Sequence, residues 1–362
     1  MSEDHQETVA KERTAPDPED PAKPDTPAEL EKPSWKYAFK RAFSEFSKDQ
    51  CTDLAAALTY YGVLSMFPGL LAVVSLLGVV GQGQATTQTI VDLLRQYAPA
   101  DVVGLLQGPI SQLTSSSGAG LALLTGVLGA LWSASGYVGA FGRAMNRIYE
   151  VEEGRPMWKL RPVTLLVTLV MTVIVVLMLA ILALSGNIAQ SVGNAVGLGS
   201  TAVTAWNVLK WPVLVVLAVA LIAVLYYATP NVRQPKFRWV SIGSVLALVA
   251  MGVAGAAFAF YVSNFSKYNA TYGAIGSVIV LLLGLWIMNN VLLFGAEVDA
   301  EIERGRELQG GLPAEETIQL PPRDTKGIEK KQEKTDKLVD EARQLRRDNG
   351  QPSETGDRAA RR

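Results

Sequence analysis

The stretch PVTLLVTLVMTVIVVLMLAILAL, residues 162–184, decides the fold class of this chain. No charged side chain interrupts it, and it lacks the charged stripe that a helix of a soluble protein presents to water. A membrane-spanning helix needs about 20 mostly apolar residues, because each residue adds about 1.5 Å across the hydrocarbon layer. The stretch therefore predicts a transmembrane helix.

Five further charge-free intervals of comparable length lie between residues 53 and 297. One Arg or Asp at the centre of a spanning helix would cost about 3 kcal/mol, so charge-free windows of this length are typical of membrane proteins. We expect helices at about 55–80, 119–142, 162–184, 211–229, 240–262 and 273–296. The predicted fold is all-α, a polytopic bundle of about six transmembrane helices.

The distribution of Lys and Arg predicts the sidedness of this bundle. Fourteen Lys and Arg side chains flank the helix ends on one side, and three flank them on the other. Because cationic flanks stay in the cytoplasm, both termini are expected inside, in a multi-pass protein of a bacterial cytoplasmic membrane. Two segments have interfacial, amphipathic patterns: residues 33–50, and the outer loop 85–116, which is either a simple anchor or a lid.

The two ends of the chain differ from the transmembrane domain, for which we expect residues 35–306. Residues 1–34 hold ten Asp and Glu, four Lys and Arg, and many prolines, a composition that predicts a disordered acidic tail. Residues 307–362 are expected to form a charged, mostly disordered cytoplasmic tail. Both tails are interpreted as solubilising, with partner binding as the alternative.

Polar side chains inside predicted spans are the best sequence indicators of function, because each needs a partner or water in the bilayer. The expected transport path or polar core consists of Tyr60, Tyr61, Ser65, Ser133, Tyr137, Asn289, Asn290 and Glu297. The alternative is that these residues only join helices to one another, or, for Glu297, that it is solvated at the inner interface.

Catalytic patterns are missing from the sequence. The single histidine, His5, lies in the acidic tail, and no metal-ligand, nucleophile-elbow or phosphate-loop spacing is found. We therefore expect no enzyme activity, no catalytic residues, no metal and no cofactor. The net charge of −1 does not favour nucleic acid as a partner; membrane lipids and a lipid or amphiphilic substrate are expected instead. The oligomeric state is left open.

Four stretches together resemble the YihY/BrkB family of bacterial inner-membrane proteins. They are DLAAALTYYGVLSMFPGLLAVVSLLG (53–78), LWSASGYVGAFGRAMNRIYEVEEGRP (131–156), LYYATPNVRQPKFRWVSIGS (225–244) and YNATYGAIGSVIVLLLGLWIMNNVLLFGAEVDAEIE (268–303). The resemblance implies a cytoplasmic-membrane protein with an envelope-related role. Members have been tied to transport of lipids or other envelope components, and to survival in serum, and the family has carried a ribonuclease label.

The resemblance also implies structural positions, none with a catalytic role. They are Pro68, Arg143, Asn146, Tyr149, Pro230, Tyr272, Gly273, Gly276 and Gly295, together with Tyr60, Tyr61 and Glu297. The chain departs from its relatives at Gly284, where a bulky aromatic is usual; this change predicts either a wider groove or closer helix packing.

Three functions follow as hypotheses. The first is transport or flipping of a lipid or other envelope component. The alternative is a non-transporting scaffold or envelope-assembly factor that acts through its cytoplasmic tails. A nuclease is disfavoured, since only the family label suggests it and the basic loops are already explained by sidedness.

Overall fold

The computed structural model describes residues 3–26, 29–80, 120–184, 200–235, 241–264 and 269–349, and most of them are helical. In chain order the helices are α1 (Glu3–Thr14), α2 (Lys32–Lys48), α3 (Cys51–Val80), α6 (Gly120–Ile148), α7 (Met157–Ala183), α9 (Ser200–Ala228), α10 (Ile242–Asn264), α11 (Asn269–Gln309) and α12 (Lys326–Asn349). Within these ranges the β-type pairing is an isolated antiparallel bridge between Val232 and Pro322. The all-α prediction is confirmed.

Four described helices are long and apolar enough to cross a membrane. The qualifying stretches are Met157–Leu182, Thr201–Ala228, Ile242–Ser263 and Val278–Gln309. They correspond to the last four predicted spans. Helices α3 and α6, with 30 and 29 residues, stand where the first two spans are expected. The fold is thus a polytopic helical membrane bundle, and the expected loop segment 85–116 lies outside the described residues.

Several helices run further than the charge-free intervals that predict them. Helix α3 begins at Cys51 rather than near residue 55, and α9 begins at Ser200 rather than near 211. Helix α11 continues past residue 296 to Gln309. The physical reason is that a charge ends an apolar interval but not a helix when it finds a partner: Lys210 of α9, for example, donates to Oδ1 of Asn207.

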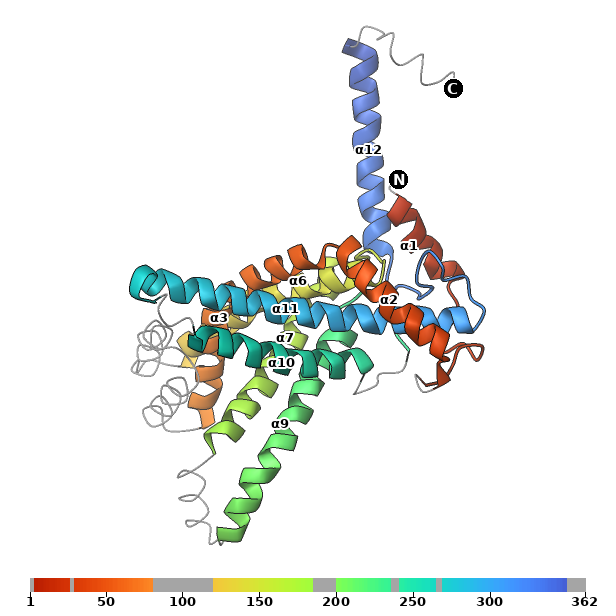
Figure 1. Cartoon of the computed structure of the whole chain (residues 1–362). Coiled ribbons are helices and arrows are strands. Elements are labelled where there is room, and N and C mark those ends of the chain that lie inside the picture. Colours follow the sequence, from red (N-terminus) through yellow and green to blue (C-terminus); the bar gives the residue numbers. More distant parts are fainter. Residues whose placement is uncertain are drawn as a thin grey trace.

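Helix α11 runs through the middle of the bundle, with α3 and α10 packed beside it (Figure 1). Helices α3 and α6 pack antiparallel over a long contact. Gly62 meets Tyr137 near one end of this contact, and Gln50 accepts a hydrogen bond from Arg147 near its other end. Helices α7 and α9 contact each other and lean away from α10 and α11 toward their far ends (Figure 1).

Two glycines bring α10 and α11 into backbone contact. A Cβ atom on Gly243 would lie 2.1 Å from the carbonyl oxygen of Gly295, so a larger residue would push the helices apart. Gly284 shows the same principle further along, since its Cβ would lie 2.8 Å from Cε1 of Phe258. Of the two alternatives for Gly284, the structure supports closer packing.

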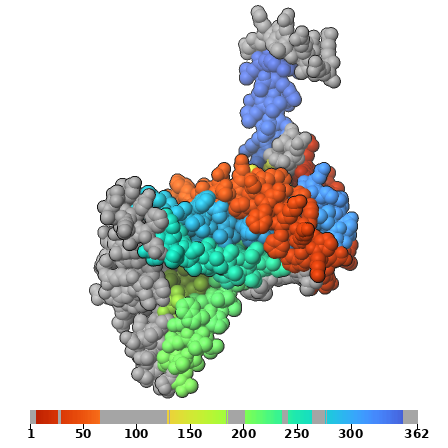
Figure 2. Space-filling view, in the orientation of Figure 1, coloured from red at the N-terminus to blue at the C-terminus, as the bar shows by residue number. Residues whose placement is uncertain are grey.

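Both tails are folded where the structure describes them, in contrast to the expectation of disorder. In the N-terminal tail α1 is helical, and the helix that follows the tail, α2, crosses the charged part of α11, burying Ala38 and Ala42 against Val298 and Ile302; Figure 2 shows α2 laid over that end of the body. Beyond α11, the segment 310–325 returns to the bundle and buries Ile318 completely in the main core. The composition argument missed this order because the tails are held by ion pairs and by contacts with distant helices.

The last described helix, α12, projects away from the bundle (Figure 1). Its first turns are anchored, since Ile328 is buried and the amide of Gly327 donates to the carbonyl of Gly154. Beyond them it is exposed, with Leu338 and Leu345 each 64% accessible. Among the described residues of the C-terminal tail, this outer part has the solvated character that the composition predicts.

Candidate functional site

Three helices meet at a hydrogen-bonded polar trio formed by Thr59, Tyr137 and Asn289. The Tyr137 hydroxyl donates to Oδ1 of Asn289 at 2.9 Å, and Nδ2 of Asn289 donates to Oγ1 of Thr59 at 3.1 Å. Thr59 in turn donates to the carbonyl of Ala55 within α3. The trio therefore joins α3, α6 and α11 with Asn289 at its centre, and it lies beside an otherwise apolar core.

Other residues of the expected polar core lie apart from this trio. Asn290 donates to the Trp286 carbonyl on its own helix, and Ser65 donates to the Tyr61 carbonyl in the same way. Tyr60 is 61% exposed, and Ser133 is also exposed. The structure brings together only part of the set, and Thr59, which completes the trio, was missed because a threonine in an apolar helix usually bonds to its own backbone.

A second polar contact lies toward the charged end of α11. The Cys51 thiol donates to Oε1 of Glu297 at 3.3 Å, and the two residues are 0% and 1% exposed. No lysine or arginine nitrogen of a described residue lies within 4.0 Å of this carboxylate. Glu297 is therefore not the solvated interfacial residue of the alternative interpretation; it is a buried acid whose partner is a weak donor.

Beyond Glu297 most charges of α11 are buried in ion pairs, except that of Asp299, which accepts a hydrogen bond from the amide of Gly243. Arg304 is fully buried; its Nε donates to both carboxylate oxygens of Glu301 at 3.0 Å, and its Nη2 pairs with Glu150 at 3.0 Å. Lys23, from the N-terminal tail, pairs with Glu303 at 3.2 Å and Glu307 at 3.4 Å. We call this region the charged end of the bundle. The sequence signal was the unbroken run EVDAEIERGRE, which continues a helix rather than a loop.

The loops at the charged end are joined through Asn231, which is fully buried. Its amide N–H donates to Oδ1 of Asn146 at 2.6 Å, and its side chain donates to the carbonyls of Glu152 at 2.8 Å and Asp324 at 2.9 Å. Arg155 adds a bond to the carbonyl of Thr229 at 2.7 Å. This loop junction ties the ends of α6 and α9 to the segment before α12.

The residues that the family resemblance marks are spread over the loop junction and several helices. Asn146 belongs to the loop junction, where Tyr149 and Pro230 are buried too. Gly295 makes the contact with α10, while Tyr272, Gly273 and Gly276 lie in the first two turns of α11. Pro68 falls within α3, and Arg143 projects from α6 with its guanidinium 5.4 Å from the ring centre of Tyr61.

The ionisable groups at the α2–α3 turn and beside the loop junction differ from the ion pairs at the charged end of the bundle. Burial raises the pKa of Asp49 to about 6, and Arg147, whose Nε lies 3.9 Å from Oδ1, offsets part of this effect. Tyr149, buried beside the loop junction, has its pKa raised well above the usual value, also by burial. The Asp49 carboxyl is therefore expected to be mostly protonated and neutral below about pH 6. The Tyr149 hydroxyl keeps its proton throughout that range.

The described residues contain no group of three His, Cys, Asp or Glu side chains that could hold a metal ion. The arrangement offers instead neutral donors and acceptors in the polar trio, a buried carboxyl at Glu297, and an exposed guanidinium at Arg143. These groups can bind polar parts of a ligand and can hold or release a proton.

Comparison with known proteins places the chain among membrane proteins. A ribonuclease-like protein, YfkH, of Bacillus subtilis is 29% identical over 269 residues, which are 74% of this chain and 96% of the relative. A UPF0761 membrane protein of Alkalilimnicola ehrlichii is 30% identical over 70% of this chain, and one of Rhodospirillum centenum is 24% identical over 74%. The matches cover 55% and 57% of those two relatives.

No solved structure matches the chain. The sequence profile of the family described as Virulence factor BrkB matches residues 42–318, which span the last two turns of α2, every described helix from α3 to α11, and the returning segment as far as Ile318. That range includes the polar trio, Glu297 and the loop junction. The chain therefore belongs to the BrkB family of membrane proteins.

Proposed function

We propose that this protein moves a lipid or another amphiphilic envelope component across a bacterial cytoplasmic membrane, with its charged end in the cytoplasm. The excess of Lys and Arg at that end supports the orientation, because cationic flanks are retained inside. The proposal assigns no catalytic residue to the chain, and it places the polar trio on or beside the path of the polar headgroup.

The observation that carries the proposal is the position of Asn289. Its amide is buried between three apolar helices and exchanges hydrogen bonds with Tyr137 and Thr59, one partner from each neighbouring helix. Polar groups inside a membrane bundle are costly and mark substrate or ion paths by default. Because all three groups are neutral, they can re-pair with a headgroup without leaving a charge unpaired.

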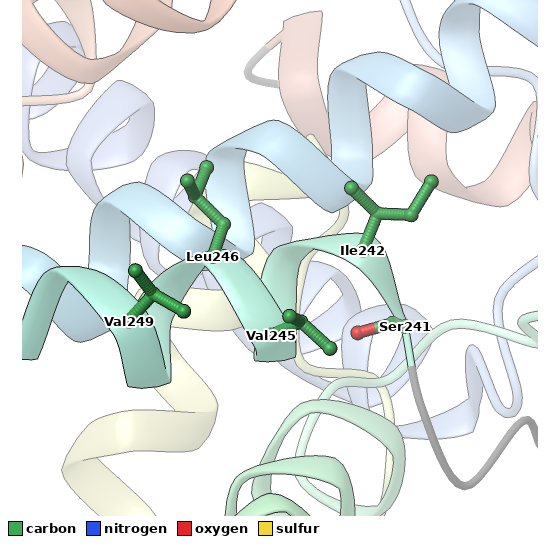
Figure 3. A pocket seen from close by; sticks show the side chains of 5 residues that line it. All are labelled: Ser241, Ile242, Val245, Leu246 and Val249. Carbon is green, nitrogen blue, oxygen red and sulfur yellow. The ribbon is translucent and has the colours of Figure 1, made fainter.

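An apolar hollow on α10 adds support for an amphiphile. It has a volume of about 370 Å³ and is open on one side, lined by Ser241, Ile242, Val245, Leu246 and Val249 (Figure 3). Ile242 and Leu246 pack toward α11, whereas Val245 and Val249 are 40% and 59% exposed. An acyl chain fits such a lining better than a sugar or a nucleotide does.

The test is reconstitution of the full chain into vesicles that contain a fluorescent phospholipid, followed by chemical quenching from outside. Transport predicts faster loss of the protected fluorescence than in protein-free vesicles. Asn289→Leu should slow this loss about tenfold, equivalent to roughly 1.4 kcal/mol. Asn290→Leu is the matched control, since among the described residues Asn290 bonds to a carbonyl of its own helix, and it should behave like the wild type.

Two results would contradict the proposal. The first is that wild-type protein moves no labelled phospholipid faster than empty vesicles do. The second is that Asn289→Leu and Asn290→Leu transport at the same rate although both fold, which would remove the polar trio from the path.

A second candidate function, a membrane scaffold, is favoured by α12. This helix projects from the bundle and leaves Leu338, Val339 and Leu345 exposed, a pattern suited to contact with a protein partner. Removing residues 332–362 separates the two functions, because the anchored start of α12 at Ile328 is kept. A scaffold would lose its cellular phenotype, and a transporter would keep its transport rate.

A further inference from the structure

Arg143 is an exposed arginine of α6, one residue beyond the expected span 119–142, and no carboxylate of a described residue lies within 4.0 Å of its guanidinium. Its neighbour one turn further along α6 is different: Arg147 is bonded to Gln50 and lies near Asp49. At the charged end, Arg304 and Arg306 are both paired with glutamates. A guanidinium in contact with lipid needs an anion or water, since an unpaired charge is costly there.

The Arg143 guanidinium is also held in a fixed place. It lies over the face of Tyr61, with its carbon 5.4 Å from the ring centre, and Nη1 passes beside Gly139. Side chains of a helix lean toward its N-terminus, so this group lies nearer the membrane interior than its own backbone does. Stacking on an aromatic face leaves the edge of the guanidinium, with its N–H donors, free for a ligand.

A second polar group, Tyr60, lies on the same helix as Tyr61 and contacts its ring. The ring of Tyr60 packs edge-on against Tyr61, with centres 5.5 Å apart, and 61% of Tyr60 is exposed. The phenol hydroxyl is a donor that suits a phosphate oxygen. Around these groups the surface is apolar, with Leu64 51% exposed on the next turn of α3. One cation, one hydroxyl and an apolar wall together match an anionic lipid.

We propose that Arg143, stacked on Tyr61 and assisted by Tyr60, binds the phosphate of an anionic phospholipid headgroup on the α3–α6 face. The planar guanidinium donates two N–H groups to the phosphate oxygens, and Tyr60 donates a third bond. The acyl chains lie against Leu64. The site supplies the substrate class for the proposed transport and to that extent rests on it, but binding is measurable without transport.

The experiment measures binding to the full chain in a neutral detergent, by native mass spectrometry or a fluorescence titration. The probes are phosphatidylglycerol, diacylglycerol with the same acyl chains, and inorganic phosphate. The variants are Arg143→Gln, Arg143→Lys and Tyr61→Leu, and the matched control is Arg147→Gln. Thermal unfolding of each variant is recorded in the same detergent.

We expect phosphatidylglycerol to bind more tightly than diacylglycerol, and Arg143→Gln to weaken it about tenfold, as loss of a charge-assisted contact does. Arg143→Lys should bind with an intermediate affinity, because the charge remains and the planar fork is lost. Tyr61→Leu should weaken binding less than Arg143→Gln does, and Arg147→Gln should stay within about twofold of the wild type.

Three outcomes would overturn the inference. One is equal affinity of wild type and the folded Arg143 variants for phosphatidylglycerol. Another is equal binding of diacylglycerol, which would leave the phosphate without a role. The third is Arg143-dependent binding of inorganic phosphate as tight as that of the lipid, which would make this a free-anion site. A protein that binds but moves no lipid would contradict the transport proposal alone.

Discussion

The thiol of Cys51 donates a hydrogen bond to Oε1 of Glu297 across the α3–α11 contact, with Sγ and Oε1 3.3 Å apart. Eight residues further along each helix, in opposite directions, Thr59 meets Asn289. The two contacts fix the antiparallel register of α3 and α11, one at the charged end and one in the polar trio.

Glu297 and Glu301 have different partners, so replacing each of them with glutamine should change the stability differently. Glu297→Gln keeps an acceptor for Cys51 and removes a buried acid that has no cationic partner among the described residues, so the unfolding temperature should stay the same or rise. Glu301→Gln weakens two bonds from buried Arg304 and should cost about 1–3 kcal/mol. Thermal unfolding in detergent compares them; a larger loss for Glu297→Gln would contradict this account.

The polar trio should act as one unit. Tyr137→Phe and Thr59→Val each remove one bond to Asn289 and are expected to cost about 0.5–1.5 kcal/mol. Because both act through Asn289, their effects should not add in a double-mutant cycle. Strict additivity of the two unfolding free energies would show that the trio is not coupled.

Asn231 is expected to be the most sensitive position of the loop junction. Asn231→Ala removes three side-chain bonds from a fully buried site and should cost about 2–4 kcal/mol. Limited proteolysis should then cut near residue 324 sooner than in the wild type. Gln234→Ala, which removes one part-buried bond, serves as the control and should have a smaller effect.

Two truncations of the C-terminal tail should have opposite outcomes. Removing residues 332–362 leaves the buried contacts intact and should not change the unfolding temperature measurably. Removing residues 310–362 takes away Ile318 and Leu320, which are 0% and 1% exposed, and should cost several kcal/mol. Equal stability of the two truncated proteins would mean that the segment 310–325 does not hold the bundle.

The raised pKa of Asp49 predicts that the stability of the protein depends on pH, and that Asp49→Asn removes this part of the dependence. Its pKa is raised to about 6 by burial, so the folded state takes up a proton as pH falls through 6 while the unfolded state does not. Its contribution to stability therefore increases as pH falls from about 6 to about 4 and is lost as pH rises. The difference in unfolding temperature between wild type and Asp49→Asn should shrink over that window; a constant difference would exclude Asp49.

The sequence predicts the membrane class well because hydrophobic length is a property of one segment at a time. It also identifies Tyr137 and Asn289 as polar residues in apolar helices. It does not separate Asn289 from Asn290, which point about 100° apart on the helix. Since α11 is apolar on most sides there, no amphipathic pattern shows which side faces α3 and α6.

The charged end was missed for a different reason. The partner of Lys23 is Glu303 and that of Arg304 is Glu150, pairs separated by 280 and 154 residues. A composition argument counts these residues as hydrophilic and predicts solvated tails. Only the fold shows that the charges neutralise one another, and that segments poor in apolar residues can be ordered by them.

Helix α11 has a mechanical consequence for the whole protein. Its 41 residues form one continuous rod, about 60 Å long, that starts among the membrane spans and ends under α2 and Lys23. If it pivots near its centre, a tilt of about 10° displaces each tip by roughly 5 Å. A rearrangement around Asn289 would thus displace the ion pairs of Glu303 and Glu307. In the same way, a partner bound to the tails would shift the part of α11 that lies among the membrane spans.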